Sequence, residues 1–390
     1  MRRIVILGAT GSIGGSTLDV LGRNPGQYEV LALAANRSGE ALLEPCRRHR
    51  PRVVVLREEA AARELSAALE REGLTGIEVR SGDDALCEVA AHPDADQVVA
   101  GIVGAAGLEP TLAAVRAGKR VLLANKECLV MAGALFMEEA RNAGATIIPV
   151  DSEHNAIFQV FPRDGDTDGI RSIQLTASGG PFRTRAVDSL AEVTPEEAVA
   201  HPNWDMGRKI SVDSATMMNK ALEIIEAHWL FGVAPADIKV VIHPESIVHS
   251  LVEYLDGSLL AQLGHPDMRT PIAAALAHPR RAESGVRSLD LAEIGSLHFE
   301  SPDYQRFPAL PQAYRALEEG GTAPAILNAA NEVAVDAFLR EQLDFPGITR
   351  VIAGTLDAAR PTPADSLDTV RAADAEARRQ AEKVLAREGR

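Results

Sequence analysis

The sequence predicts an α/β protein with three parts: a parallel sheet covered by helices, a central α+β region and a helical C-terminal part. Short β-branched runs alternate with helical stretches over the first 150 residues. Strand-like and helical runs are then mixed up to about residue 277, and every periodic segment after residue 303 is helical. Alternating strands and helices are typical of a parallel sheet with helices on both faces.

Short apolar runs mark the strands, and the helices lie between them. In the first part we expect strands at residues 4–7, 29–34, 53–56, 97–102, 121–124 and 146–150. In the central part we expect strands at 172–176, 239–242, 247–253 and 259–262, with a helix at 215–230. In the last part we expect helices at 308–319, 324–339, 347–356 and 366–387.

These segments predict a nucleotide-binding domain at 1–150 and a catalytic α+β domain at 151–277. A stretch with several proline and glycine residues predicts a linker at 278–303, followed by a helical domain at 304–390. A long segment at about 178–208 is expected to act as a lid over the site.

Charge and cysteine usage exclude several classes of partner. The net charge of −15 gives no counterion release on nucleic acid, so we expect no nucleic-acid partner. Three cysteines without metal or disulfide spacing favour a reducing, cytoplasmic location. No apolar run approaches the roughly 18 residues of a membrane span.

A glycine-rich turn follows the first strand and opens a helix. Gly8, Gly11 and Gly14 have the spacing G-x-x-G-x-x-G, a variant of the dinucleotide fingerprint of Rossmann-like folds. Glycines let the backbone approach a pyrophosphate, and the helix N-terminus supplies N–H donors. A bare tight turn is the alternative. The second strand leads into Ala35-Asn36-Arg37-Ser38, where Arg37 with Ser38 suits the 2′-phosphate of NADPH, although an exposed loop arginine is also consistent.

Polar side chains follow two later strands. Lys126 comes soon after an apolar strand, where an ordinary turn is the alternative to a site. If the chain stays extended after residue 150, Asp151 and Glu153 point the same way. Oxygen ligands favour Mg²⁺ or Mn²⁺ over zinc, and Glu223 would complete the set. A solvated strand end, and an i,i+3 pair of Glu223 with Lys220, are the alternatives.

Residues 201–223 are the most informative segment because they hold many groups that a core would reject. Ser214, Asn219 and Lys220 are candidates to hold a phosphate. The Ser178-Gly179-Gly180 turn is either an anion cradle or a plain turn. His201 is a weaker candidate phosphate donor, and Trp204 either covers the substrate or packs structurally.

Six segments of the chain carry a family resemblance: GATGSIG, LANKE, DSEHNAIFQ, LTASGGPFR, HPNWDMGRKISVDSATMMNKALE and GHPDMRTPI. They resemble those of 1-deoxy-D-xylulose 5-phosphate reductoisomerases, in the same order and over nearly the whole chain. The resemblance implies conversion of this sugar phosphate to 2-C-methyl-D-erythritol 4-phosphate in non-mevalonate isoprenoid biosynthesis. It also implies NADPH, Mg²⁺, Mn²⁺ or Co²⁺ as cofactors, and a cytoplasmic homodimer.

The resemblance also implies residue roles. The metal ligands are Asp151, Glu153 and Glu223, and the groups near the reacting end of the substrate are Lys126 and Ser152. The phosphate set is Ser178, His201, Ser214, Asn219 and Lys220. The NADPH contacts are Thr10, Gly11, Ser12, Ile13, Asn36, Arg37, Ser38, Asn125, Glu127 and Gly207, with Met268 against the nicotinamide. At 36–38 the chain has Asn-Arg-Ser where many members have Gly-Arg/Lys-Asn, which bears on Asn36 and Ser38.

Two other classes of protein share some of these features. An aspartate-semialdehyde-type NADP-dependent dehydrogenase also has a GATG-type turn, but it needs a nucleophilic cysteine, and none of the three lies in such a setting. A non-catalytic nucleotide sensor would not need three placed carboxylates and a phosphate set.

Overall fold

The computed structural model describes residues 1–162, 165–204 and 207–388, and its chain divides into two compact units. The first unit comprises Met1–Cys128, Phe136–Phe158 and Asp267–Arg287. The second comprises the remaining described residues. Each unit is described by itself. The segment 267–287 groups with the N-terminal unit here, whereas the three domains drawn from the sequence divide the chain differently and stay a prediction.

The first unit contains a seven-stranded sheet in which every pair of neighbours is parallel. The strand order is β4-β3-β2-β1-β5-β6-β7. The strands are β1 (Arg2–Leu7), β2 (Tyr28–Ala35), β3 (Val53–Leu56), β4 (Glu78–Ser81), β5 (Gln97–Ala100), β6 (Arg120–Leu123) and β7 (Thr146–Pro149). The order reverses between β1 and β5, so the carboxyl ends of these strands form the crevice where such sheets bind ligands.

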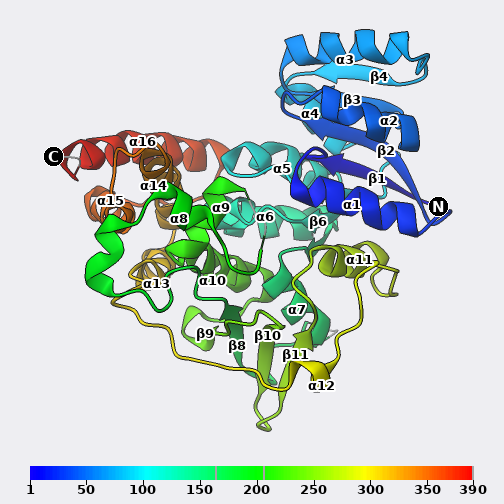
Figure 1. Ribbon diagram of the computed structural model, residues 1–390. Helices are drawn as coiled ribbons and strands as arrows, with labels where there is room; N and C mark the ends of the chain where they lie inside the picture. Colours follow the sequence, from blue (N-terminus) through cyan, green and yellow to red (C-terminus); the bar gives the residue numbers. More distant parts are fainter. Residues whose placement is uncertain (163–164, 205–206, 389–390) are drawn as a thin grey trace. The chain divides into compact units, whose positions relative to one another are not determined.

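Helices surround this sheet (Figure 1). They are α1 (Ser12–Arg23), η1 (Glu40–Leu42), α2 (Leu43–His49), α3 (Glu59–Arg71), α4 (Asp83–Ala90), η2 (Ala105–Gly107), α5 (Leu108–Arg116), α6 (Glu127–Ala143), α7 (Ser152–Val160) and α11 (Arg269–Ala277). Residues 129–135 of α6 and 159–160 of α7 are grouped with the second unit. The core holds fully buried Ile4 and Ile6 of β1 together with Ile272 of α11, although α11 comes late in the chain. Arg269 of α11 also forms an ion pair with Asp19 of α1 at 3.2 Å.

The second unit combines a four-stranded sheet with a helical bundle (Figure 1). The sheet has the order β11-β10-β8-β9, and only β8 and β9 are parallel. Its strands are β8 (Ile170–Ala177), β9 (Ile238–Ile242), β10 (Val248–Tyr254) and β11 (Leu259–Leu263). The bundle helices are α13 (Ala309–Glu319), α14 (Ala323–Leu339), α15 (Phe345–Ala358) and α16 (Leu367–Glu388). The shorter helical segments are η3 (Val187–Glu192), α8 (Pro195–Val199), η4 (Pro235–Asp237) and α12 (Leu291–Ile294).

Three local predictions were wrong or incomplete. The predicted helix at 215–230 is present as α10 (Met218–Phe231), but it begins three residues later than expected because Met217 takes a left-handed φ of 62°. The helix before it, α9 (Arg208–Ala215), was not predicted. Strand β4 was missed because its sequence, EVRS, is a partly exposed edge strand without an apolar run. The extended conformation expected after residue 150 is absent, since α7 begins at Ser152.

The predicted fold class is confirmed in its three parts: the N-terminal parallel sheet, the mixed α+β sheet and the C-terminal helical bundle. Among the described residues, none of the helices combines the length and apolar character required for crossing a membrane.

Candidate active site

The glycine turn between β1 and α1 is shaped for close approach of another backbone or a ligand. Gly8 has a φ of +83°, and a Cβ there would lie 2.5 Å from the carbonyl oxygen of Gly101. Thr10, Gly11 and Ser12 are exposed, and no side chain caps the N-terminus of α1. The first N–H groups of this 12-residue helix are therefore available to a pyrophosphate, which is the feature that a dinucleotide site needs.

Several of the predicted cofactor residues lie in the loops that follow β2 and β6. Asn36, Arg37 and Ser38 are exposed and directly follow β2. Asn125 is buried and donates through Nδ2 to the carbonyl oxygens of Ile102 and of Gly104, at 3.0 Å in the second case. This amide joins the loops after β5 and β6, while its Oδ1 accepts no hydrogen bond from the described residues.

A buried cluster of charged side chains surrounds the start of α7. The Nζ atom of Lys126 lies 2.5 Å from Oδ2 of Asp151, and Ser152 donates to the carboxylate of Glu153. Burial acts to raise the pKa of Asp151, but the Lys126 ammonium and the His154 ring outweigh it and hold that pKa well below its usual range. A carboxylate oxygen of Asp151 and one of Glu153 lie within 4.8 Å of each other.

The helix start, and not an extended strand, brings the Asp151 and Glu153 carboxylates together. The positively charged Lys126 ammonium lies beside Asp151. The groups that Asp151 and Glu153 offer as metal ligands are all carboxylate oxygens. This donor chemistry fits a hard divalent cation such as Mg²⁺ or Mn²⁺.

In the second unit, Ser178 and His201 are in direct contact. The Nδ1 atom of His201 accepts hydrogen bonds from the backbone N–H groups of Asn203 (3.1 Å) and Trp204 (3.0 Å). Nδ1 therefore carries no proton, so Nε2 bears it and donates to Ser178 Oγ at 3.0 Å. Burial lowers the pKa of His201, which favours this neutral form.

Ser178 therefore has a defined hydrogen-bonding capacity. Its Oγ accepts from His201 Nε2 and from the N–H of Gly180 at 3.1 Å, so its own proton is left to donate to a ligand. A Cβ at Gly180 would lie 2.8 Å from the carbonyl oxygen of Ser214, so this glycine turn packs directly against the C-terminal end of α9. Ser178 and Ser214, predicted from distant motifs, thus belong to one region of the second unit.

Helix α10 carries the remaining predicted groups on one face. Lys220 and Asn219 both donate to the Glu223 carboxylate, Asn219 at 2.5 Å. Lys220 and Glu223 are almost completely buried, at 3% and 0% exposure. The i,i+3 pair of Lys220 with Glu223, which was the alternative to a metal-ligand role for Glu223, is therefore present. Its burial distinguishes it from an ordinary surface pair, because buried charges are expensive unless they serve one another or a ligand.

Other predicted residues lie in less specific settings. Gly207 directly precedes α9, Trp204 has its ring 6.3 Å from that of His249, and Met268 packs against the core of the first unit. In the predicted lid at 178–208, η3 and α8 are packed elements, and residues 205 and 206 lie outside the described residues. Lid function stays a prediction.

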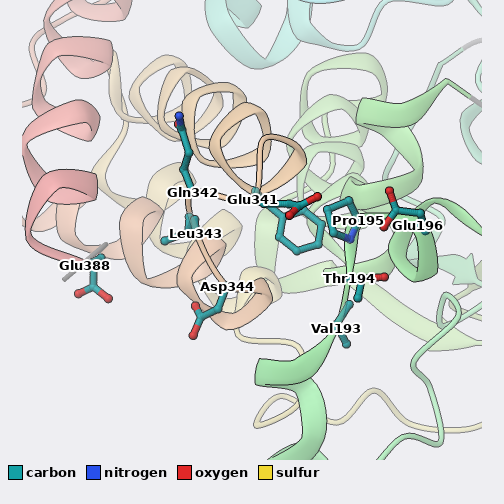
Figure 2. A pocket seen from close by; sticks show the side chains of 10 residues that line it. Val193, Thr194, Pro195, Glu196, Glu341, Gln342, Leu343, Asp344 and Glu388 are labelled. Carbon is teal, nitrogen blue, oxygen red and sulfur yellow. The ribbon is translucent and has the colours of Figure 1, made fainter.

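One cavity of about 520 Å³ in the second unit is lined by none of the predicted site residues (Figure 2). Residues 193–196 form one side, and the loop between α14 and α15 with Glu388 forms the other. Its charged lining groups are the carboxylates of Glu196, Glu341, Asp344 and Glu388, which would repel a phosphate. It is therefore not the substrate site.

The cysteines do not support a thiol nucleophile. Cys46 and Cys128 are fully buried, and burial raises the pKa of the Cys46 thiol to about 11. Cys87 lies in α4, and none of the predicted site residues belongs to that helix. The dehydrogenase alternative, which needs an activated cysteine, gains no support.

A parallel sheet with an open glycine turn at its switch point, in a chain that also holds two carboxylate–lysine pairs and a histidine-bonded serine, has the features of an α/β enzyme that uses a dinucleotide. Family profiles narrow the class. Residues 4–133 match "1-deoxy-D-xylulose 5-phosphate reductoisomerase", and residues 147–231 and 263–380 match two C-terminal domains of the same family. The chain belongs to the 1-deoxy-D-xylulose 5-phosphate reductoisomerase family.

Curated relatives and solved structures agree with this assignment. The relative from Ralstonia pickettii is 62% identical over 99% of this chain and 98% of its own length. The relative from Aromatoleum aromaticum is 59% identical over 100% of this chain and 97% of its own length. Both carry the family's name.

Among solved structures, the Zymomonas mobilis reductoisomerase in complex with NADPH matches with a TM-score of 0.93 and 49% identity, covering 98% of this chain and 99% of that one. A reductoisomerase in complex with NADPH, fosmidomycin and magnesium matches with a TM-score of 0.95 and 45% identity, covering 99% and 98%. The resemblance inferred from the motifs is thus confirmed.

Sequence reasoning missed several residues that shape this region. Asn203, Asp213 and His243 were not predicted, although each makes specific hydrogen bonds near a predicted group. Only Asp213 had a local signal, because Lys209 lies four residues before it and pairs with it at 2.9 Å. The Asn203 carboxamide bonds Pro244, 41 residues away, and His243 Nδ1 contacts the carbonyl oxygen of His298, 55 residues away, so no spacing rule predicts these two contacts.

Proposed function

We propose that this chain converts 1-deoxy-D-xylulose 5-phosphate to 2-C-methyl-D-erythritol 4-phosphate, using NADPH and a divalent metal. The observation that carries the proposal is the hydrogen-bonding state of Ser178, whose hydroxyl proton is left for an anionic ligand beside His201, Gly180 and Ser214. Family membership supplies the identity of that ligand, a sugar phosphate. Ser178, His201, Ser214, Asn219 and Lys220 bind its phosphate.

Asp151, Glu153 and Glu223 hold the metal in this proposal. Support comes from their chemistry, since each is a carboxylate, and from the lysine that accompanies Asp151 and Glu223 alike. When bound, Mg²⁺, Mn²⁺ or Co²⁺ would act as a Lewis acid on the ketone and neighbouring hydroxyl of the substrate. Lys126 and Ser152 orient these oxygens and offer hydrogen bonds to them.

NADPH binds along the carboxyl edge of the parallel sheet. The N–H groups around Thr10, Gly11, Ser12 and Ile13 take the pyrophosphate, and Arg37, with Asn36 and Ser38, takes the 2′-phosphate. The rest of the NADPH molecule is contacted by Asn125, Glu127, Gly207 and Met268, and Met268 lies against the nicotinamide. Trp204 and the lid at 178–208 exclude water from the aldehyde that NADPH reduces. The cofactor-binding domain is 1–150 and the catalytic domain is 151–277. A linker at 278–303 connects the catalytic domain to the helical domain at 304–390.

The chain forms a homodimer in the cytoplasm in this proposal. Strand β11 is at the edge of its sheet and exposes Leu259, Leu260 and Leu263, and an exposed apolar edge strand is a surface for pairing with a second copy. None of the three cysteines forms a disulfide within the described residues, as expected for a reducing compartment. Light scattering on wild type and Leu260→Lys tests the dimer: a monomeric wild type would contradict it.

One assay tests the function directly. Absorbance of NADPH is followed with 1-deoxy-D-xylulose 5-phosphate, with and without Mn²⁺. We expect oxidation only when both the sugar phosphate and the metal are present. Oxidation that persists after metal removal, or its absence in the complete mixture, would contradict the proposal.

A further inference from the structure

The turn at residues 243–247 is bonded to the end of strand β8, directly beside Ser178. The N–H of His243 donates to the carbonyl oxygen of Ala177 at 2.7 Å, one residue before Ser178. The turn closes on itself: Ser246 N–H donates to His243 O, and Ile247 N–H donates to His243 Nε2, both at 3.1 Å. Ser246 also holds a left-handed φ of 54°. Such a conformation persists only where its surroundings fix it, so this turn is a firm support.

The same turn is bonded to the segment that carries His201. The side chain of Asn203 donates through Nδ2 to Pro244 O at 2.7 Å and lies 3.0 Å from Ser246 Oγ. Its backbone N–H, with that of Trp204, donates to Nδ1 of His201. Asn203 is therefore bonded to His201 through its backbone and to the turn through its carboxamide.

We propose that Asn203 is a positioning residue for substrate binding. Through the 243–247 turn it holds the His201 ring against Ser178, at the 3.0 Å that lets Nε2 donate to Oγ. The inference rests on the proposed function, in which Ser178 and His201 serve the phosphate. Without the carboxamide, residues 201–204 lose their side-chain anchor, and the Ser178 hydroxyl loses the donor that directs its proton to the ligand.

The test compares Asn203→Ala with Asn142→Ala, a matched control at an exposed position of α6. We expect the KM for the sugar phosphate and the inhibition constant of inorganic phosphate to rise together, by about 10- to 100-fold for a ligand group misplaced by ~1 Å. The KM for NADPH should stay unchanged, which a general loss of folding would not allow. The control should match wild type in all three constants.

A double-mutant cycle with His201→Gln decides whether Asn203 acts through His201. If it does, Asn203→Ala adds little once His201 is replaced, so the two effects are not additive. Additive effects, or an unchanged KM for the sugar phosphate in a folded Asn203→Ala enzyme, overturn this inference but leave the proposed function intact. If Asn203→Ala does not fold, Ser246→Ala removes one of the two contacts and should give a smaller rise of the same kind. A wild type without any turnover overturns the proposed function, and this inference with it.

Discussion

The ammonium group of Lys126 lies 2.5 Å from the carboxylate of Asp151, and both side chains are largely buried. In the proposed function, Asp151 is a metal ligand and Lys126 donates hydrogen bonds to the oxygens of the substrate. We expect Lys126→Met to lower kcat by about 10²- to 10³-fold, as when one preorganised stabilising group is removed. Steady-state kinetics measure the loss.

Binding of Mn²⁺ to the Lys126→Met enzyme should persist or tighten, because a positive charge next to Asp151 is removed. Titration calorimetry measures this binding. Lys383→Met, at an exposed position of α16, is the control and should leave both quantities unchanged. A variant that keeps its kcat within twofold would place Lys126 outside the reaction.

Replacing Glu223 by glutamine separates metal binding from cofactor binding. The carboxylate is fully buried and receives Lys220 and Asn219, so Glu223→Gln keeps the shape but removes the negative charge. We expect turnover to fall by at least about 10³-fold, as for loss of a group that acts only in the transition state. Affinity for NADPH, measured by fluorescence titration, should not change. Retained turnover in metal-free buffer would refute a ligand role; Glu382→Gln, exposed on α16, is the control.

Arg37 sets the choice between NADPH and NADH if it binds the 2′-phosphate. Its side chain is exposed, so Arg37→Asp should leave the melting temperature unchanged. A charged hydrogen bond to phosphate is worth about 1.5–3 kcal/mol, so the NADPH-to-NADH ratio of kcat/KM should fall by about 10- to 100-fold. An unchanged ratio would show that residues other than Arg37 bind the 2′-phosphate.

Much of the fold could be predicted because its signals are local. Residues 4–7 of β1 and the whole of β3 are continuous apolar runs, and the glycine turn at Gly8 lies between a strand and a helix. The break at Met217 could not be predicted, since a left-handed methionine is held by packing that spacing does not encode. For the same reason the site was predicted as residue types but not as geometry: Asn203 and Pro244 meet across 41 positions of sequence.

Two adjacent glycines in α1 should respond oppositely to alanine. A Cβ at Gly14 would lie 2.5 Å from backbone atoms of Ala9, whereas a Cβ at Gly15 would meet nothing within 4 Å. Gly14→Ala should therefore cost about 1–3 kcal/mol of stability and raise the KM for NADPH, because the helix must move away from the glycine turn. Gly15→Ala should stabilise by about 0.5–1 kcal/mol, as expected for an open helix position. Equal effects in denaturant unfolding would contradict the packing argument.

His249 should make the stability of the second unit fall in mild acid. The pKa of this histidine is lowered to about 4, mainly by burial and to a smaller extent by the nearby His243 and Lys220, while backbone hydrogen bonds with His265 and Gly264 oppose the shift. An unfolded histidine titrates near 6.5, so between pH 6.5 and 4 the unfolded state binds the extra proton and the folded state does not. Stability is therefore fully present above pH 6.5 and decreases as the pH falls, by about 2 kcal/mol at pH 5 for one such group.

The prediction for His249 is checked by urea unfolding of wild type and His249→Asn at pH 7.5 and pH 5. The variant cannot take up this proton, so it should lose about 2 kcal/mol less stability than wild type between the two pH values. Its absolute stability at pH 7.5 should be lower, since a packed ring beside Trp204 is removed. Other acidic and basic groups contribute equally to both proteins, so the difference between the two pH dependences isolates His249. Parallel pH dependences would mean that His249 is protonated in the folded protein as readily as in the unfolded chain.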